Sequence, residues 1–237
     1  MAAGGAANLA RMTQITLLVG PAAPLPGSTA LSGIAKQPVD RPLALGPEGF
    51  QGDEQADRRV HGGPEKAVHH YPFDHYPTWA AELGPLPLLA SPGAFGENIS
   101  TLGLTETEVA VGDIFRLGGA LVQVSQGRQP CWKLTQRFGV DKLARRVQDT
   151  GRTGWYYRVL EPGQVAPDGQ LELIDRPAPD WTLARLWRAL YVDRMNLAEL
   201  QGIAALDLLA EGWRRYAIRR LDSGRVEDWS KRLEGGA

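Results

Sequence analysis

Residues 108–126 read EVAVGDIFRLGGALVQVSQ, and this stretch decides the class of fold. Two runs in which apolar and polar residues roughly alternate flank Gly118 and Gly119. Such alternation is typical of a strand with one buried face, and a Gly-Gly pair suits a tight turn with positive φ. The stretch therefore predicts a β-hairpin.

Other β signals lie on both sides of this hairpin. The run QITLLV at residues 14–19 predicts a strand, and Pro167, Asp168 and Gly169 predict a turn between YYRVL and QLELI. One helix is expected over residues 141–149, stopped by Gly151. The whole chain has 28 glycines and 17 prolines, which suit many turns. We therefore expect a mainly β fold with some α, in which residues 1–176 form a β-rich, barrel-like or sandwich domain.

The composition changes after the proline-bearing segment RPAPD at residues 176–180. Thr182 and Asn196 are placed to cap two helices, and a third is expected over residues 206–220. The tail RVEDWSKRL, residues 225–233, can add a last turn or two. One face of the first helix carries Leu183, Leu186, Trp187 and Leu190. Residues 177–237 are thus expected to form a small three-helix domain.

Charge and cysteine content exclude several classes of protein. The chain of 237 residues has a formal net charge of −1, which gives no global reason to expect nucleic acid or an acidic membrane as a partner. A single cysteine cannot form an internal disulfide, which fits a reducing compartment. Neither a signal peptide nor a membrane-spanning run is recognisable. The expectation is a cytoplasmic protein.

All four histidines, at positions 61, 69, 70 and 75, lie in one short region. Their spacing does not match the helical metalloprotease pair, and Pro72 and Pro77 break any long helix through them. His61 precedes Gly62 and Gly63, whose backbone N–H groups could cradle an anion. Two other interpretations stay open at this point: a tight structural turn, and a zinc site in a hydrolase. His69, His70 and His75 are expected to be structural or surface groups.

The lone Cys131 also has two interpretations. A single cysteine is commonly a small buried hydrophobe. Here Arg128 precedes it and Lys133 follows it in a polar loop, and nearby cations favour the thiolate, which binds soft metals and attacks electrophiles. The more specific prediction is therefore that Cys131 is a thiolate metal ligand among anion-binding residues.

Several segments, taken in order, carry a family resemblance. They are GDEQADRRVHGGPEKAVHHYPFDHYPTW, FGENISTLGLTE, VGDIFRLGGALVQVSQGRQPCWKL and TGRTGWYYRV, followed by the short helical tail. Together they resemble the MOSC domain family, named after the C-terminal region of molybdenum cofactor sulfurases. The narrower similarity is to a bacterial branch with a C-terminal three-helix extension, linked to resistance against 6-N-hydroxylaminopurine.

The resemblance implies a barrel-like MOSC fold and the molybdenum cofactor, with Cys131 as the thiolate ligand to the metal. Related reductases remove oxygen from N-hydroxylated substrates with electrons from a separate redox protein, here expected to be a flavoprotein. Catalytic roles then fall to Cys131, His61 and Asp53. The residues expected to bind the cofactor are Lys36, Arg58, Gly62, Gly63, Glu97, Asn98, Arg128 and Lys133.

One further alternative follows from the same resemblance, and another follows from the charge of the tail. The chain could hold the cofactor, or carry sulfur on a Cys131 persulfide, without reducing anything. Arginines are locally dense in the tail, at Arg214, Arg215, Arg219 and Arg220. This arginine run could dock the electron donor or a second subunit of a homodimer, or could simply be a solvated helix face.

Overall fold

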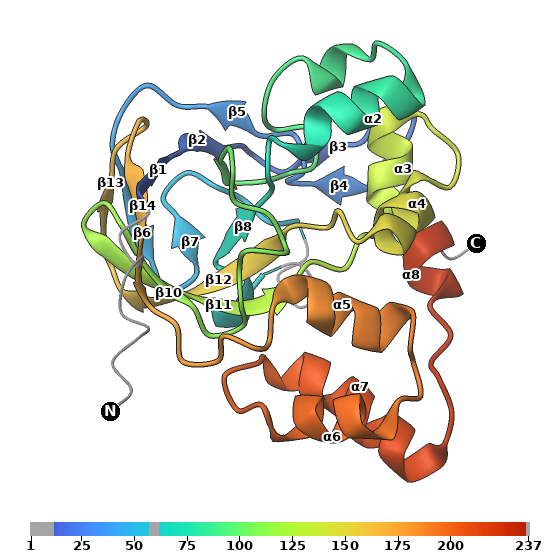
Figure 1. Cartoon of the computed structure of the whole chain (residues 1–237). Helices are drawn as coiled ribbons and strands as arrows, with labels where there is room; N and C mark the ends of the chain where they lie inside the picture. Colours follow the sequence, from blue (N-terminus) through green and yellow to red (C-terminus); the bar gives the residue numbers. More distant parts are fainter. Residues whose placement is uncertain (1–11, 57–61, 236–237) are drawn as a thin grey trace, which may run out of the picture.

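The structure is a computed structural model that describes residues 12–56 and 62–235. Within these residues a nine-stranded sheet curls into a half-barrel, with helices along one side and at one end (Figure 1). Its strands, in spatial order, are β1 (Met12–Gln14), β14 (Gln170–Asp175), β10 (Ile114–Leu117), β11 (Ala120–Gly127), β12 (Trp155–Glu161), β8 (Val68–His70), β9 (Ile99–Ser100), β2 (Thr16–Val19) and β5 (Gln37–Pro38). Smaller sheets join β13 (Gly163–Val165), β6 (Leu43–Gly46) and β7 (Gly49–Phe50), and β3 (Ala23–Pro24) with β4 (Leu31–Ser32).

The predicted hairpin is confirmed as β10 and β11. Leu117 pairs with Ala120 across the turn, and Gly118 has a φ of 56°, in the left-handed region that favours glycine. The pairing of β11 with β12 shifts register twice, before Val122 and again after Val124. Such irregularities bend a strand and increase its twist, which fits the curl of the sheet.

Three helices share a second hydrophobic cluster: α2 (His75–Leu83), α3 (Trp132–Phe138) and α4 (Leu143–Thr150). The short 3-10 helix η2 (Pro87–Leu89) lies with them, and a second one, η1 (Pro64–Lys66), precedes β8. The predicted helix over 141–149 is α4, and Gly151 ends it with a φ of 75°. The other two helices were not predicted. Pro77 is compatible with α2 because it lies in the first turn, where the backbone needs no intrahelical donor.

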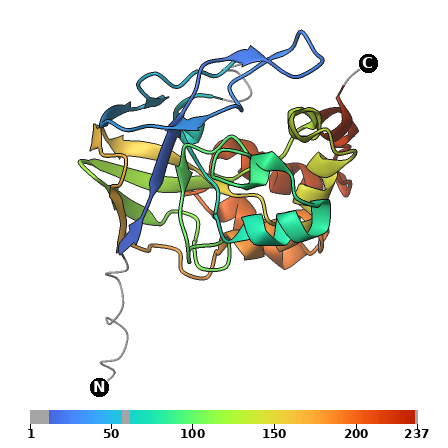
Figure 2. The same cartoon turned by 90° about the horizontal axis from the view of Figure 1, so that it is seen from above.

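The C-terminal tail is helical, as predicted: α5 (Leu183–Tyr191), α6 (Leu197–Ala205), α7 (Glu211–Ser223) and α8 (Ser230–Glu234). Thr182 and Asn196 cap α5 and α6 by accepting hydrogen bonds from the backbone N–H groups of Arg185 and Glu199. Seen from above, the helices gather on one side of the sheet (Figure 2). The mainly β fold with a C-terminal helical region is thus confirmed.

The sheet and the tail share one hydrophobic core. Val122, Val124 and Trp155 from the sheet belong to the same buried cluster as Leu186 and Trp213 from the tail. The helical region therefore packs on the sheet rather than beside it, and a domain boundary at residue 176 stays a prediction. Among the described residues no helix has the length and apolar character needed to cross a membrane.

Candidate functional site

A cavity lies where six segments of the chain meet, with about 660 Å³ of empty space that includes open solvent. These segments are residues 32–36, residues 53–56, residues 66–69, residues 95–98, residues 128–133, and β12 at Tyr156. Six of the residues selected from the sequence line it: Lys36, Asp53, Asn98, Arg128, Cys131 and Lys133. Positions up to a hundred residues apart in the sequence are thus brought to one place.

Cys131 lies at the junction between the sheet and α3. β11 ends at Gly127, and the backbone N–H of Arg128 still donates to the carbonyl of Gly154, which fixes the start of the loop. Cys131 has an extended backbone and precedes the first turn of α3, where its carbonyl accepts a hydrogen bond from Leu134. Its side chain is half-buried and faces the cavity. The thiol is therefore accessible to a ligand.

Cationic side chains surround the thiol. Arg128 is 6% exposed, its Nη2 donates weakly to the Phe95 carbonyl, and its Nη1 is buried without a hydrogen-bond partner among the described residues. Lys133 Nζ donates to the carbonyl of Leu31 at 2.9 Å. Burial lowers the pKa of Lys66, and the nearby sulfur of Cys131 partly offsets this. An anionic ligand would neutralise charges that the cavity wall keeps close together.

Lys36, Asp53 and Asn98 form a buried polar cluster in the cavity wall. Lys36 Nζ forms a short ion pair with Asp53 Oδ1, which also accepts from the backbone N–H of Gly20. Asp53 Oδ2 accepts from Asn98 Nδ2 at 3.0 Å. Burial lowers the pKa of Lys36, and Asp53 opposes that shift. Both oxygens of Asp53 are thus engaged, and the ion pair holds Lys36 at the cavity wall.

Asn98 links three segments through its side-chain amide. Its Nδ2 also donates to the carbonyl of Leu18, and its Oδ1 accepts from the backbone N–H of His69. Both ends of the amide are occupied by the protein, so Asn98 supports the cavity wall.

Adjacent histidines on β8 face opposite sides, as strand geometry requires. His69 lines the cavity against the ring of Tyr156, with 4.9 Å between ring centroids. Burial, reinforced by Arg128, lowers the pKa of His69 well below its ordinary value, so the ring is neutral near pH 7. Its buried Nε2 lacks a hydrogen-bond partner among the described residues.

The other two described histidines are held by protein groups. His70 Nδ1 bonds the Tyr157 hydroxyl at 3.0 Å and Nε2 bonds Thr101 Oγ1 at 2.8 Å. His75 Nε2 contacts Glu106 Oε2 at 2.7 Å. Over residues 12–56 and 62–235, no group of three or more His, Cys, Asp or Glu is placed to hold a metal, so these residues do not support the zinc interpretation. The structural role expected for His70 and His75 fits these contacts, whereas His69 belongs to the cavity.

The structure does not bring every selected residue to the cavity wall. Glu97 is fully buried behind it, where its carboxylate accepts from the Tyr76 hydroxyl and from the backbone N–H groups of Gly93 and Phe95. Gly62 and Gly63 precede η1 and are not among the lining residues. Arg58 and His61 lie outside the described residues.

Several lining residues were not selected from the sequence, including Lys66, Gln129 and Tyr156. Lys66 follows the Gly-Gly-Pro step in the segment that was singled out. Tyr156 lies between Trp155 and Tyr157, which both face the core, so alternation along β12 places it on the other face.

Comparisons with known proteins agree with this fold. The model of the MOSC domain matches residues 57–172, and that of the YiiM-like 3-alpha helix domain matches residues 181–224. Protein YiiM of Escherichia coli is 45% identical over 208 residues, which cover 86% of this chain and 91% of that protein. The crystal structure of YiiM from Escherichia coli superposes with a TM-score of 0.79 at 35% identity, covering 94% of this chain and 98% of the other.

Another relative is longer. A protein of Gibberella moniliformis named "Reductase" is 40% identical over 189 residues, which cover 78% of this chain but only 34% of that protein. The extent of the bacterial matches, together with the two family models, is decisive: the chain belongs to the MOSC domain family and carries the YiiM-like three-helix domain at its C-terminal end.

Proposed function

We propose that the chain is a molybdenum-cofactor-dependent reductase of N-hydroxylated compounds such as hydroxylaminopurines. Cys131 would be the thiolate ligand to molybdenum, and a separate redox protein, most simply a flavoprotein, would supply electrons. The observation that supports this best is the half-buried thiol in a cavity whose neighbouring Arg128 has a buried, unpartnered Nη1 among the described residues.

The cavity fits the cofactor in charge and in donor type. The cofactor carries a phosphate and a dithiolene, both anionic, and the wall presents Arg128, Lys36, Lys66 and Lys133. Cys131 offers a single soft sulfur donor, which suits a thiophilic transition metal.

When bound, the cofactor would supply the two-electron chemistry that no side chain can perform. The protein residues would bind and orient. Arg128 can donate to an anionic oxygen through Nη1, and Lys36, which Asp53 holds at the cavity wall, is a second cationic donor. Departure of an oxygen atom as water needs protons, and Lys36 is a lining residue that could supply them. Proton relay by Asp53 or His61 stays a prediction.

The comparisons support the coarser part of this proposal. Membership of the MOSC family associates the chain with the molybdenum cofactor, and the name of the longer Gibberella protein supports reductase chemistry. The substrate, the electron donor and the requirement for molybdenum belong to the proposal.

The experiment is metal analysis and turnover on protein produced in cells with an intact cofactor pathway. We expect stoichiometric molybdenum and pterin in the wild type, with reduction of an N-hydroxylated purine by a flavoprotein donor. Cys131→Ala should lose both metal retention and turnover, whereas Glu211→Gln, an exposed change on α7, should keep both. Full activity of Cys131→Ala would show that the ligand assignment is wrong. Bound cofactor without turnover from any donor would favour a carrier instead.

A further inference from the structure

The residues that flank Cys131 are held by the C-terminal tail. We call residues 128–132 the cysteine loop and residues 225–235 the C-terminal segment. Gln129, Pro130 and Trp132 each contact a residue of α5, α7 or the C-terminal segment. The tail thus reaches both sides of the cysteine from behind the cavity.

Gln129 is held by two tyrosines of the tail. Its Nε2 donates to the hydroxyl of Tyr191 at 2.9 Å, and its Oε1 lies 3.5 Å from the hydroxyl of Tyr216. Burial raises the pKa of Tyr191 to about 12, so this hydroxyl stays protonated over the working pH range. Because Gln129 lines the cavity, this contact links the tail directly to the cavity wall.

Pro130 is held by Arg232 of α8. Arg232 Nη1 donates to the Pro130 carbonyl in a short hydrogen bond, and Nη2 donates to Gln148 Oε1 of α4 at 2.5 Å. The guanidinium therefore spans α4 and the cysteine loop. Arg232 itself is not among the residues that line the cavity, so it acts on the loop from outside.

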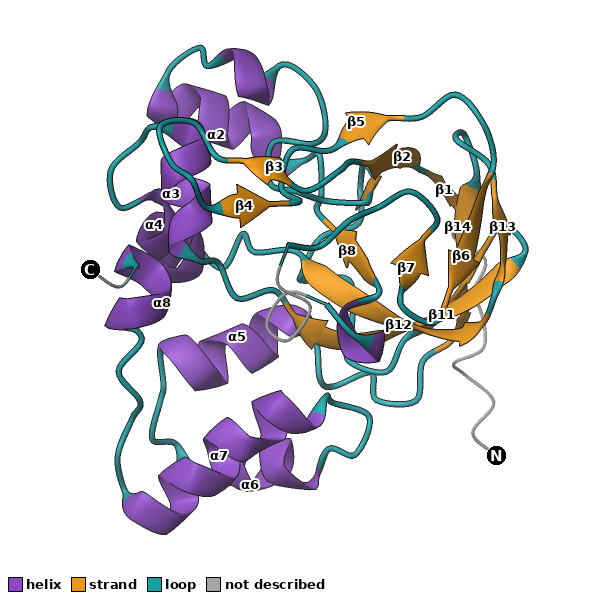
Figure 3. Cartoon of the chain, turned by 180° about the vertical axis from the view of Figure 1, so that it is seen from behind, coloured by secondary structure: helices purple, strands orange, loops and turns teal. Residues whose placement is uncertain are grey.

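The C-terminal segment is itself anchored. α8 lies beside α3 and α4 (Figure 3). Leu233 is buried, and Glu234 pairs with Arg145 of α4 at 2.7 Å. A Cβ placed on Gly235 would lie 3.4 Å from Trp132 Cγ, so the end of the segment rests against the residue that follows Cys131.

The contact with Pro130 fixes more than one atom. The carbonyl of Pro130, the amide nitrogen of Cys131 and the Cα of Cys131 lie in one peptide plane. A hydrogen bond that orients the carbonyl therefore orients the whole plane, including the Cα of Cys131 to which its side chain is attached. Because proline has no backbone N–H, the backbone of residue 130 can be held by a hydrogen bond only through its carbonyl.

We propose that Arg232 is a positioning residue for Cys131, so that the C-terminal segment forms part of the architecture of the cavity. The functional meaning rests on the proposed function, in which Cys131 binds the metal. The structural claim can be tested without metal, because Cys131 is the only cysteine in the chain.

The test uses the full chain without cofactor and two readouts. Alkylation by iodoacetamide, followed by intact mass, reports on Cys131 alone, and amide hydrogen exchange reports on residues 128–135. The variants are Arg232→Gln and Arg232→Lys; the lysine keeps the positive charge but cannot hold Pro130 and Gln148 together. Lys231→Gln, an exposed neighbour in the same helix, is the matched control.

Loss of a charged hydrogen bond to a buried carbonyl should speed exchange of the cysteine loop by about tenfold. Alkylation should accelerate with it in both Arg232 variants, while Lys231→Gln behaves like the wild type and exchange in β12 is unchanged. If Arg232→Gln does not fold, Arg232→Lys, which has the same net charge as the wild type, is compared with the wild type instead. The inference would be overturned if Arg232→Lys showed the same alkylation rate and the same loop exchange rate as the wild type. It would also be overturned if exchange became faster to the same extent in β12.

Measurements on protein that carries the cofactor distinguish a failure of this inference from a failure of the proposed function. If the substitution displaces Cys131 from the metal, kcat of Arg232→Lys should fall by a larger factor than KM changes. A wild type that binds no molybdenum would refute the proposed function and leave the exchange result intact. A fully active wild type with an unaltered loop in both variants would refute only the positioning role.

Discussion

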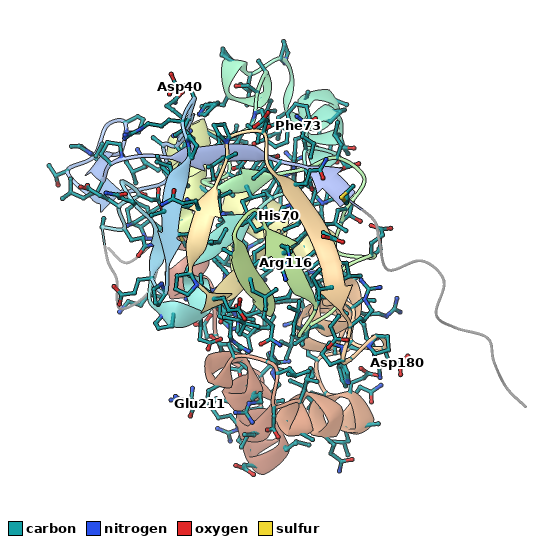
Figure 4. The ribbon with its side chains drawn as sticks, turned by 90° about the vertical axis from the view of Figure 1, so that its left-hand side faces the viewer. Asp40, His70, Phe73, Arg116, Asp180 and Glu211 are labelled. Atoms are coloured by element: carbon teal, nitrogen blue, oxygen red, sulfur yellow. The ribbon has the colours of Figure 1, made fainter. Side chains whose placement is uncertain are left out.

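Acid should destabilise this protein through His70, and the size of the effect can be worked from the structure. His70 is fully buried in the interior of the sheet (Figure 4), with its ring 4.2 Å from that of Trp155. Both ring nitrogens are bonded to hydroxyl groups, of Tyr157 and Thr101. Burial lowers the pKa of His70 from 6.5 to about 3, because no anion compensates a charged ring there.

The sign follows from proton counting. Between about pH 6.5 and about pH 3 the unfolded chain binds a proton at this histidine and the folded chain does not, so stability falls as the pH falls. One group of this kind removes about 1.4 kcal/mol for each pH unit in that window, or about 2 kcal/mol at about pH 5. A folded pKa one unit higher changes the value at that pH very little.

The assay is urea unfolding of wild type and His70→Gln from about pH 7 to about pH 4.5. The variant should be less stable than the wild type at neutral pH. The slope of its unfolding free energy against pH should also be smaller than that of the wild type, by an amount that corresponds to close to one bound proton. Tyr157→Phe is the control, because it breaks the same hydrogen-bond pair without removing the titrating ring. Equal slopes for wild type and His70→Gln would refute the reasoning.

Two further perturbations test the cavity wall and the tail. Asp53→Asn leaves the charge of Lys36 buried and uncompensated, so we expect a loss of roughly 3 kcal/mol in urea unfolding, much of it recovered when Lys36→Met is added. A chain truncated to residues 1–176 should fail to fold, as judged by circular dichroism and solubility. The truncation removes five large core side chains, each worth about 1.5–3 kcal/mol against a total stability of about 5–15 kcal/mol. These are Leu186, Leu190, Leu200, Ile203 and Trp213. A soluble, folded fragment would instead establish the boundary predicted at residue 176.

The features that the sequence predicted well have local causes. The hairpin at Gly118, the end of α4 at Gly151, and the caps at Thr182 and Asn196 each depend on a few neighbouring residues. α3 was missed because WKLTQRF is short and follows a proline-containing loop, where it is held by packing against α4 and α8 rather than by its own propensity.

The site was predicted only in part, because residue type does not reveal direction. His69 and His70 are neighbours with the same chemistry, and a one-residue step along β8 places one in the cavity and the other in the core. The sequence likewise gave no reason to connect Arg232 with Cys131, since that contact joins residues about a hundred positions apart.

The placement of charge distinguishes the cavity from the tail. Arg128 and Lys133 donate to backbone carbonyls, which satisfy hydrogen bonds without cancelling charge, so a positive potential persists beside the thiol. On the tail, Arg185, Arg214 and Arg215 each pair with a carboxylate. Exposed pairs of this kind contribute little stability and little net field. In the arginine run that suggested a docking face, Arg214, Arg215 and Arg220 are therefore paired with nearby acids, whereas Arg128 and Lys133 in the cavity wall donate to carbonyl groups.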